Sequence, residues 1–258
     1  MTSWPTEYDR IFLKQIDSTN AEAIRRSCFL EKSTWIVAEL QTSGRGRRGR
    51  AWLMDRDNFA ATLVLRTKIS LKEAAFKSFV ASLALRYTFV RHCKNEGSFK
   101  LKWPNDVLLN GGKVAGILLE SSGKGKFIDS LIIGIGANLA SAPLRSEVDF
   151  SSGSPVSVKN VLGLQISPND FLYTLARSFK YYDDEIKNTG FKGIKTEWLK
   201  HAAKLNEEVI ARVGLKEIRG IFRDISDDGA LIIENLEGMK EIAAADVYFG
   251  EDKNAFSN

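Results

Sequence analysis

A glycine- and arginine-rich segment is the most chemically distinctive part of the sequence. It reads Gly44-Arg45-Gly46-Arg47-Arg48-Gly49-Arg50, with Trp52 close behind. Arginine binds phosphate through two parallel hydrogen bonds, and glycine lets backbone amides approach an anion closely. The segment therefore predicts a phosphate-binding loop, although its composition fits a solvated basic loop or an RNA contact equally well. It is not a P-loop, because G-x-x-x-x-G-K-[ST] does not occur.

A second candidate segment, KWPND, occupies residues 102–106. Pro104 cannot continue a strand inside a sheet, so Asn105 and Asp106 are expected at a strand end, where they can face a pocket. An ordinary β-turn explains the same residues. Lys113 follows on a predicted hairpin, where a lysine is normally solvated, but Gly116 within the next apolar strand indicates that something approaches the backbone there.

The rest of the composition narrows the chemistry. His92 and His201 are the two histidines of the chain, and neither C-x-x-C nor H-x-x-x-H occurs, which disfavours a zinc site. No G-x-S-x-G elbow is present, which disfavours a Ser-His-Asp hydrolase. The 37 Lys and Arg against 32 Asp and Glu give a net charge of +5, which fits a small anionic ligand and does not require nucleic acid.

Length and composition describe a globular chain of one to two domains. It has 258 residues, 44% of them hydrophobic and 27% charged. The first ten residues lack the apolar run of a signal peptide, and the apolar stretches are too short to span a membrane. Two cysteines, Cys28 and Cys93, cannot form a disulfide framework, so a reducing cytoplasm is expected.

The elements that must position these motifs can be predicted from periodicity. Strands are expected over residues 34–40, 61–66 and 127–135, and Asn110-Gly111 between two apolar runs predicts a hairpin. Thr19 and Glu22 have capping-box spacing for a short helix. A longer helix is expected over residues 71–91, with a buried stripe formed by Phe76, Phe79, Val80, Leu83, Ala84 and Tyr87.

The amino-acid composition changes twice in the second half of the chain. Residues 141–163 are rich in Ser, Pro and Gly and predict a long surface loop. Ser167 and Pro168 open a predicted helix, and a second helix is expected over residues 191–203. Short strands with turn dipeptides then predict an all-β module. The fold class is therefore α+β, with a body over residues 1–205 and a module over residues 206–258.

Taken together, the motifs resemble those of the biotin–protein ligase (biotin–acetyl-CoA-carboxylase ligase) family. The resemblance rests on DSTN at residues 17–20, QTSGRGRRGRAW at 41–52 and KWPNDVLLNGGKVAGILLE at 102–120, in the family's order and spacing. It covers nearly the whole chain. It implies a mixed β-sheet with flanking helices, related to class II aminoacyl-tRNA synthetases, and a C-terminal SH3-like barrel.

The resemblance also implies a two-step reaction. Biotin and ATP form biotinyl-5′-AMP, and the biotinyl group then passes to one lysine of a biotin carboxyl carrier domain of a carboxylase. Mg²⁺ is expected with the nucleotide phosphates, with no dedicated protein cage for a metal. Which carboxylase accepts the group, and whether the chain forms a homodimer, stay open.

The family's roles can be carried onto matching positions. Lys113, Arg45, Arg47, Asn105 and Asp106 are the expected catalytic residues, with Lys113 meeting both the biotin carboxylate and the α-phosphate. Biotin is expected against Ser18, Thr19, Asn20, Gln41, Gly44, Arg45, Gly46, Arg47, Lys113 and Gly116. The adenylate is expected against Arg47, Arg50, Trp52, Lys113 and Asn138.

The sequence also departs from the family pattern. Many members carry an N-terminal helix-turn-helix domain, for which the seventeen residues before Ser18 leave no room, so no DNA binding is expected. Residues 57–61 read DNFAA where a Gly-Asn-Leu-Tyr-like stretch is usual, and Ala137 replaces a β-branched residue. Both affect details of the pocket rather than the reaction.

Two alternatives remain, one on the same fold and one from a different class of protein. A lipoate–protein ligase would carry an R-R-x-S-G-G-G loop, and an octanoyltransferase needs a cysteine nucleophile beside a lysine. Cys28 and Cys93 fall in predicted helical segments and are expected to be small buried residues. A nucleic-acid-binding module would need a basic face that continues beyond residues 44–50, which we call the arginine loop. Glu39, Asp55 and Asp57 would interrupt such a face.

Overall fold

The computed structural model describes residues 3–122, 127–148, 154–214 and 216–249. A seven-stranded sheet forms the body, in the order β1-β2-β3-β7-β6-β5-β4. Its strands are β1 (Asp9–Leu13), β2 (Thr34–Ala38), β3 (Phe59–Ser70), β4 (Phe99–Lys102), β5 (Asp106–Leu109), β6 (Gly112–Ser122) and β7 (Phe127–Ala137). The β1–β2 pair is parallel and the other pairs are antiparallel, so the predicted mixed sheet is confirmed.

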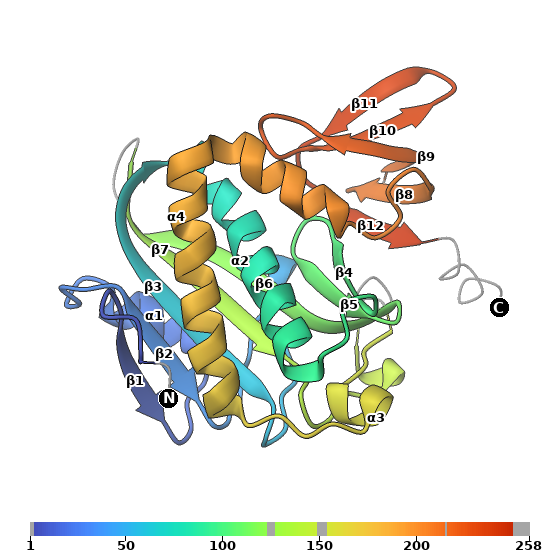
Figure 1. The fold of residues 1–258 in the computed structure, drawn as a ribbon. Helices are drawn as coiled ribbons and strands as arrows, with labels where there is room; N and C mark the ends of the chain where they lie inside the picture. Colours follow the sequence, from blue (N-terminus) through green and yellow to red (C-terminus); the bar gives the residue numbers. More distant parts are fainter. Residues whose placement is uncertain (1–2, 123–126, 149–153, 215, 250–258) are drawn as a thin grey trace.

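Two long helices cover one face of this sheet (Figure 1). They are α2 (Leu71–Cys93) and α4 (Pro168–Lys200), and the backbone of α4 leaves the helical region at Gly190. The two helices predicted in the second half of the chain are therefore joined end to end. The stripe predicted for α2 is correct except at Tyr87, which is 48% exposed because it lines a surface hollow between α2 and α4.

The short helix α1 (Thr19–Arg26) lies against the opposite face of the sheet. Its Ala23 packs with Ile36, Val64 and Ile132, whereas the neighbours Trp35 and Ile133 belong to the core under the long helices. This alternation follows from the two-residue period of a strand. The cap of α1 is Ser18 rather than Thr19, because the Ser18 side chain accepts the hydrogen bond from the backbone of Ala21.

The region predicted as a surface loop, residues 141–163, is only partly loop. It contains the 3₁₀ turn η2 (Arg145–Glu147) and helix α3 (Val158–Leu162), while residues 149–153 lie outside the described part. Val158 is fully buried, and backbone hydrogen bonds join Lys113 to Ser154 and Val156. The segment therefore packs against the hairpin that carries Lys113.

The C-terminal module is a five-stranded antiparallel sheet that lies beside β4 and β5 and the C-terminal half of α4 (Figure 1). Its strands are β8 (Glu208–Val213), β9 (Lys216–Ile225), β10 (Leu231–Asn235), β11 (Gly238–Ile242) and β12 (Asp246–Phe249). The order β11-β10-β9-β8-β12 is linear, so within the described residues the sheet is open and no closed barrel is formed. The predicted α+β class is nonetheless correct.

Candidate active site

A cavity opens on the α1 face of the large sheet, between α1, the arginine loop and the β5–β6 hairpin. Fourteen of the fifteen predicted site residues line it, namely Ser18, Thr19, Asn20, Gln41, Arg45, Gly46, Arg47, Arg50, Trp52, Asn105, Asp106, Lys113, Gly116 and Asn138. The fifteenth, Gly44, does not line the cavity. A Cβ at Gly44 would lie 2.3 Å from the Trp52 carbonyl oxygen. The glycine therefore allows the backbone at residue 44 to pass close to the backbone at residue 52.

Glycines on β6 and β7 form the floor of the cavity. The two-residue period places Gly134 and Gly136 on the same face as Ile132, the face that packs on α1. A Cβ on Gly134 would lie 2.0 Å from Asn20 Oδ1, and one on Gly136 would lie 2.3 Å from Trp52 Cε2. The absence of side chains here leaves room for Asn20 and Trp52 to lie flat on the sheet.

One end of the cavity is polar, and its carboxylate, Glu120, is neutralised by an ion pair with Arg45. Gln41 Oε1 accepts hydrogen bonds from the backbone amide and hydroxyl of Thr19, at 2.7 and 2.9 Å. The Thr62 hydroxyl lies 2.6 Å from Asn20 Oδ1 and 2.8 Å from Thr19 Oγ1. Asn20 in turn donates to Glu120 at 2.8 Å. Because these buried groups hold one another in place, the end is preorganised for a ligand with its own donors and acceptors.

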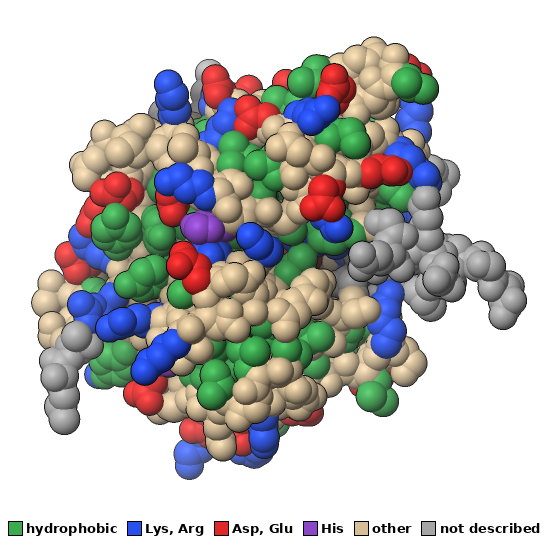
Figure 2. Space-filling model, turned by 45° about the vertical axis from the view of Figure 1, so that its right-hand side comes forward, with side chains coloured by type: hydrophobic (Ala, Val, Ile, Leu, Met, Phe, Trp, Pro, Cys, Tyr) green, Lys and Arg blue, Asp and Glu red, His purple; other side chains and the backbone are tan. Residues whose placement is uncertain are grey.

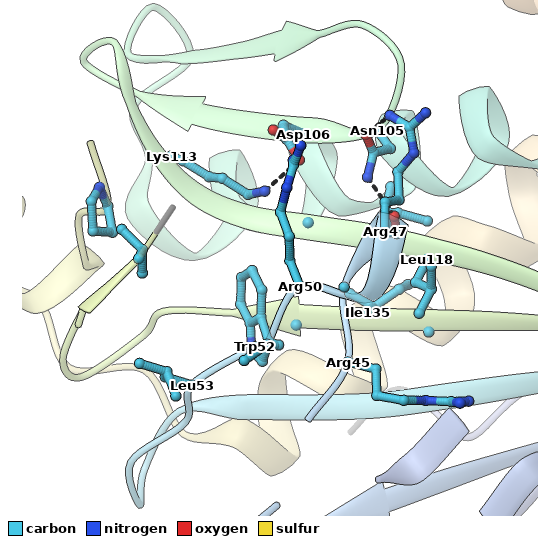
Figure 3. A pocket seen from close by; sticks show the side chains of 18 of the residues that line it. Arg45, Arg47, Arg50, Trp52, Leu53, Asn105, Asp106, Lys113, Leu118 and Ile135 are labelled. Atoms are coloured by element: carbon cyan, nitrogen blue, oxygen red, sulfur yellow. Dashed lines mark hydrogen bonds and ion pairs between the residues drawn. The ribbon is translucent and has the colours of Figure 1, made fainter. Parts of the chain in front are cut away.

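The other end is cationic. Lys113 Nζ lies 2.8 Å from Asp106 Oδ1, and Figure 3 shows the two side chains pointing toward one another. The ammonium is also 5.8 Å from the centre of the Trp52 ring. With 19% of its side chain exposed, Lys113 is not the solvated hairpin lysine of the simpler prediction. A positive charge is therefore fixed next to the indole ring, above Gly116.

The arginine loop covers the cavity, and its side chains go in different directions. Arg47 donates to Asn105 Oδ1 at 3.1 Å, while Arg45 points away from Lys113 (Figure 3) and pairs with Glu120 at 3.0 Å. Burial lowers the pKa of the Arg47 guanidinium below its ordinary value, against the opposing effect of two nearby aspartates. A half-buried cation bonded to a neutral amide is stabilised by an anion that enters the cavity.

Asn105 and Asn138 are both tied to backbone. Asn105 donates to the Ile117 carbonyl at 2.6 Å, which holds its oxygen toward Arg47. Asn138, 3% exposed, donates to the Val156 carbonyl at 3.1 Å. Its side chain thus fixes the segment that packs on the hairpin, in addition to lining the cavity.

Sequence reasoning missed several residues of the site. Thr62 and Glu120 complete the polar end, and Leu118 lines the cavity beside it. Glu120 closes the GILLE motif, and its polar side chain at the end of an apolar run was the available signal. Asp246 carried no signal, because it lies about 200 residues away along the chain from the arginines that it contacts.

The cavity can accept a metal ion that arrives with a nucleotide. Within the described residues, no three His, Cys, Asp or Glu side chains are placed to hold a metal. Asp106 Oδ1 is buried and, apart from its ion pair with Lys113, has no hydrogen bond of good geometry there. Mg²⁺ bound to a nucleotide needs only one or two protein carboxylates, because phosphates and water supply the other ligands.

Cys28 and Cys93 do not line the cavity. Cys28 is exposed and lies beyond the end of α1, so its predicted burial within a helix is wrong. Cys93 ends α2, and burial raises the pKa of its thiol to about 11. Neither cysteine is placed to act as a nucleophile beside Lys113. No described helix is long and apolar enough to cross a membrane.

Comparisons with known proteins identify relatives of this chain. The Biotin/lipoate A/B protein ligase family model matches residues 12–138, and the Biotin protein ligase C terminal domain model matches residues 204–250. The biotin--[acetyl-CoA-carboxylase] ligase of Paracoccus denitrificans is 48% identical over 238 residues, which cover 92% of this chain and 99% of that protein. The bifunctional ligase/repressor BirA of Escherichia coli is 31% identical, covering 86% of this chain and 68% of that protein.

Solved structures show the same fold. The biotin protein ligase from Aquifex aeolicus in complex with biotin and ATP superposes with a TM-score of 0.78 at 27% identity, covering 93% of this chain and 97% of that chain. The resemblance drawn from the DSTN, GRGRRGR and KWPND motifs is thereby confirmed. The chain belongs to the biotin–protein ligase family.

Proposed function

We propose that this protein is a biotin–protein ligase that acts on a biotin carboxyl carrier domain of acetyl-CoA carboxylase or a related carboxylase. It forms biotinyl-5′-AMP and pyrophosphate from biotin and ATP, and then transfers the biotinyl group to a lysine. One observation above all supports this: a single cavity has a neutral polar end and a cationic end, and Lys113 is fixed at the cationic end by Asp106. The family relationship supports the same reaction.

Biotin occupies the neutral end in this proposal. Its ureido ring offers two N–H donors and a carbonyl acceptor, which match the hydroxyls and amides of Ser18, Thr19, Asn20 and Gln41. Because these groups are already bonded among themselves, they lose little freedom when the ring enters. The apolar body of biotin then lies against Leu118 and the glycine floor.

Adenylation takes place beside Lys113. A biotin carboxylate oxygen attacks the α-phosphorus, the bond to the β-phosphate bridging oxygen breaks, and pyrophosphate leaves. Both reactants are anionic, so a fixed cation between them lowers the barrier. Asp106 holds the ammonium in place before the substrates bind. Asp106 is the residue here that would contact Mg²⁺ bound to the nucleotide, or its waters, and the ion would neutralise phosphate charge.

The adenine lies near Trp52 and Asn138, with Arg47 and Arg50 toward the phosphates. Trp52 lies across Gly116 and Gly136 with its ring open to the cavity. In the second step the acceptor lysine attacks the acyl carbon of the mixed anhydride, and AMP leaves. Until then the arginine loop shields the anhydride from water.

The C-terminal module begins near residue 206 in our proposal, and five short antiparallel strands support an SH3-like arrangement for it. The reducing cytoplasm is the proposed compartment, in keeping with two free cysteines. Light scattering can test directly whether the protein forms a homodimer.

Nucleic-acid binding was the main alternative from another class of function, and the arginine pairings weigh against it. Arg45 pairs with Glu120, and Arg48 and Arg50 pair with Asp246, so much of the loop's charge is neutralised within the protein. Figure 2 shows acidic and basic side chains interspersed on the face it presents. A gel shift at low salt should show no saturable binding of DNA or RNA.

Acceptor labelling tests the proposed function. Purified protein, biotin and ATP are incubated with a biotin carboxyl carrier domain, and the products are blotted with streptavidin. A carrier domain whose acceptor lysine is changed to arginine is the matched control. Labelling of the first domain alone is expected. If lipoate in place of biotin gives the efficient transfer, the protein belongs to the lipoate branch and the proposal is wrong.

A further inference from the structure

The arginine loop is attached to the C-terminal module through one carboxylate. Asp246, the first residue of β12, is 8% exposed and lines the cavity. Its Oδ2 lies 2.6 Å from Arg48 Nη1 and 2.5 Å from Arg50 Nη2. Two guanidiniums from the loop therefore converge on one oxygen of a different structural unit.

These contacts set the shape of the loop. Arg48 has φ 55° and ψ 34°, a left-handed conformation that is unfavourable for a residue with a side chain. The turn is closed by hydrogen bonds from the Gly46 amide to the Arg50 carbonyl and from the Arg50 amide to the Arg47 carbonyl. The ion pairs at Arg48 and Arg50 fix the C-terminal side of this turn, and Arg47, which directly precedes Arg48, is directed to Asn105.

The module also contacts the body at places that do not involve Asp246. The Trp103 indole donates to the Gly229 carbonyl at 3.0 Å, and Lys102 Nζ lies 4.7 Å from the centre of the Phe249 ring. Lys195 pairs with Asp224 at 3.0 Å. Loss of the Asp246 carboxylate should therefore release the loop while the module stays docked.

We propose that Asp246 is a positioning residue that holds the arginine loop over the cavity, so that the C-terminal module takes part in retaining the adenylate. The proposal rests on the proposed ligase function. Without the carboxylate, the loop loses two charge-assisted hydrogen bonds and opens more often. Lys113 and Asp106 do not contact Asp246 directly, so the chemical step should change little.

The test compares Asp246→Ala with Asp224→Ala, which removes a carboxylate of another ion pair between the module and the body. Each variant is loaded with labelled biotin and ATP, and loss of bound biotinyl-AMP is followed by rapid gel filtration. Biotin-dependent pyrophosphate exchange supplies kcat and the KM for ATP. We expect Asp246→Ala to release adenylate about tenfold faster with a KM for ATP raised about tenfold, and kcat within about threefold. Asp224→Ala should match the wild type.

Arg48→Ala tests the same contact from the loop side, since Arg48 does not line the cavity. It should speed release in the same direction but by less than Asp246→Ala does, because the Arg50–Asp246 pair remains, and the double variant should match Asp246→Ala alone. Wild-type release in Asp246→Ala, equal effects in Asp224→Ala, or additive effects in the double variant would overturn the proposal. If Asp246→Ala fails to fold, the release of biotinyl-AMP from Arg48→Ala and Asp246→Asn tests the proposal instead. A wild-type protein without biotin-dependent exchange would instead refute the ligase function itself.

Discussion

Lys113 and Asp106 form an ion pair at the centre of the site, with Nζ 2.8 Å from Oδ1 and side chains only 19% and 15% exposed. The two residues come from the adjacent strands β6 and β5, so the hairpin itself sets their distance. A charge pair withdrawn from water is costly to split, because the remaining partner is left uncompensated. Lys113 therefore has a structural partner as well as its proposed chemical role.

Lys113→Ala separates these two roles. We expect pyrophosphate exchange to fall about a hundredfold, since one well-placed charge is worth roughly 3 kcal/mol in the transition state. Loss of a solvated hairpin lysine would leave folding unchanged, whereas loss of this ion pair should lower the free energy of unfolding by about 1 to 3 kcal/mol. Adding Asp106→Asn should restore stability in urea denaturation without restoring exchange. Exchange at the wild-type rate in Lys113→Ala would remove this residue from the mechanism.

Arg47→Gly should make the enzyme leak its intermediate. The change removes the hydrogen bond to Asn105 and adds backbone freedom, so the closed loop loses population. Adenylate still forms because Lys113 remains, and it then acylates bystander lysines. Streptavidin blots of added albumin should show labelling well above wild type, while Arg56→Gly, in an exposed loop, should not. A variant that makes no adenylate at all would place Arg47 in the catalytic set.

The glycine floor predicts opposite substrate effects at two neighbouring positions. Gly134→Ala would push on Asn20 and should raise the KM for biotin about tenfold, with the KM for ATP little changed. Gly136→Ala would push on the Trp52 ring and should raise the KM for ATP about tenfold, with the KM for biotin little changed. Gly97→Ala, where a Cβ meets no atom within 4 Å, is the control. Equal effects on both substrates would show that the cavity is not divided as proposed.

Local sequence signals predicted the hairpin, and the family resemblance predicted residues that the structure gathers around one cavity. Asn110 and Gly111 have φ 48° and 87°, values that an Asn-Gly turn between apolar runs adopts readily. Fourteen of fifteen predicted residues line one cavity because the family motifs fix backbone geometry as well as chemistry. The β1 strand at the edge of the sheet was missed, since its DRIFL sequence is short and half-exposed.

Contacts between segments far apart in the sequence could not be predicted from local sequence signals. The Asp246–Arg48 pair joins residues 198 positions apart, and nothing local marks Asp246 as different from other acidic residues. The exposure of Tyr87 likewise depends on where α4 crosses α2. Periodicity in the sequence predicts which face of a helix is buried, but it does not predict how much of that face the partner helix covers.

Stability should fall on mild acidification because of His92. The half-buried ring lies against Phe171 with Nε2 3.0 Å from Thr174 Oγ1, and burial lowers the pKa of His92 below 6.5. The unfolded chain therefore takes up the proton more readily, so this residue's contribution is present above pH 6.5 and is lost as pH falls through the folded-state pKa. His92→Gln should flatten the decline in unfolding free energy between about pH 7 and pH 5 measured in urea. An unchanged slope would contradict the assignment.

Biotin-dependent exchange of radiolabelled pyrophosphate into ATP tests the central claim most directly, because it requires no acceptor protein. The cavity described here predicts rapid exchange with biotin and ATP, background exchange with lipoate, and a large loss in Lys113→Ala with biotin. Exchange that is independent of biotin, or that lipoate supports as well as biotin does, would contradict the account.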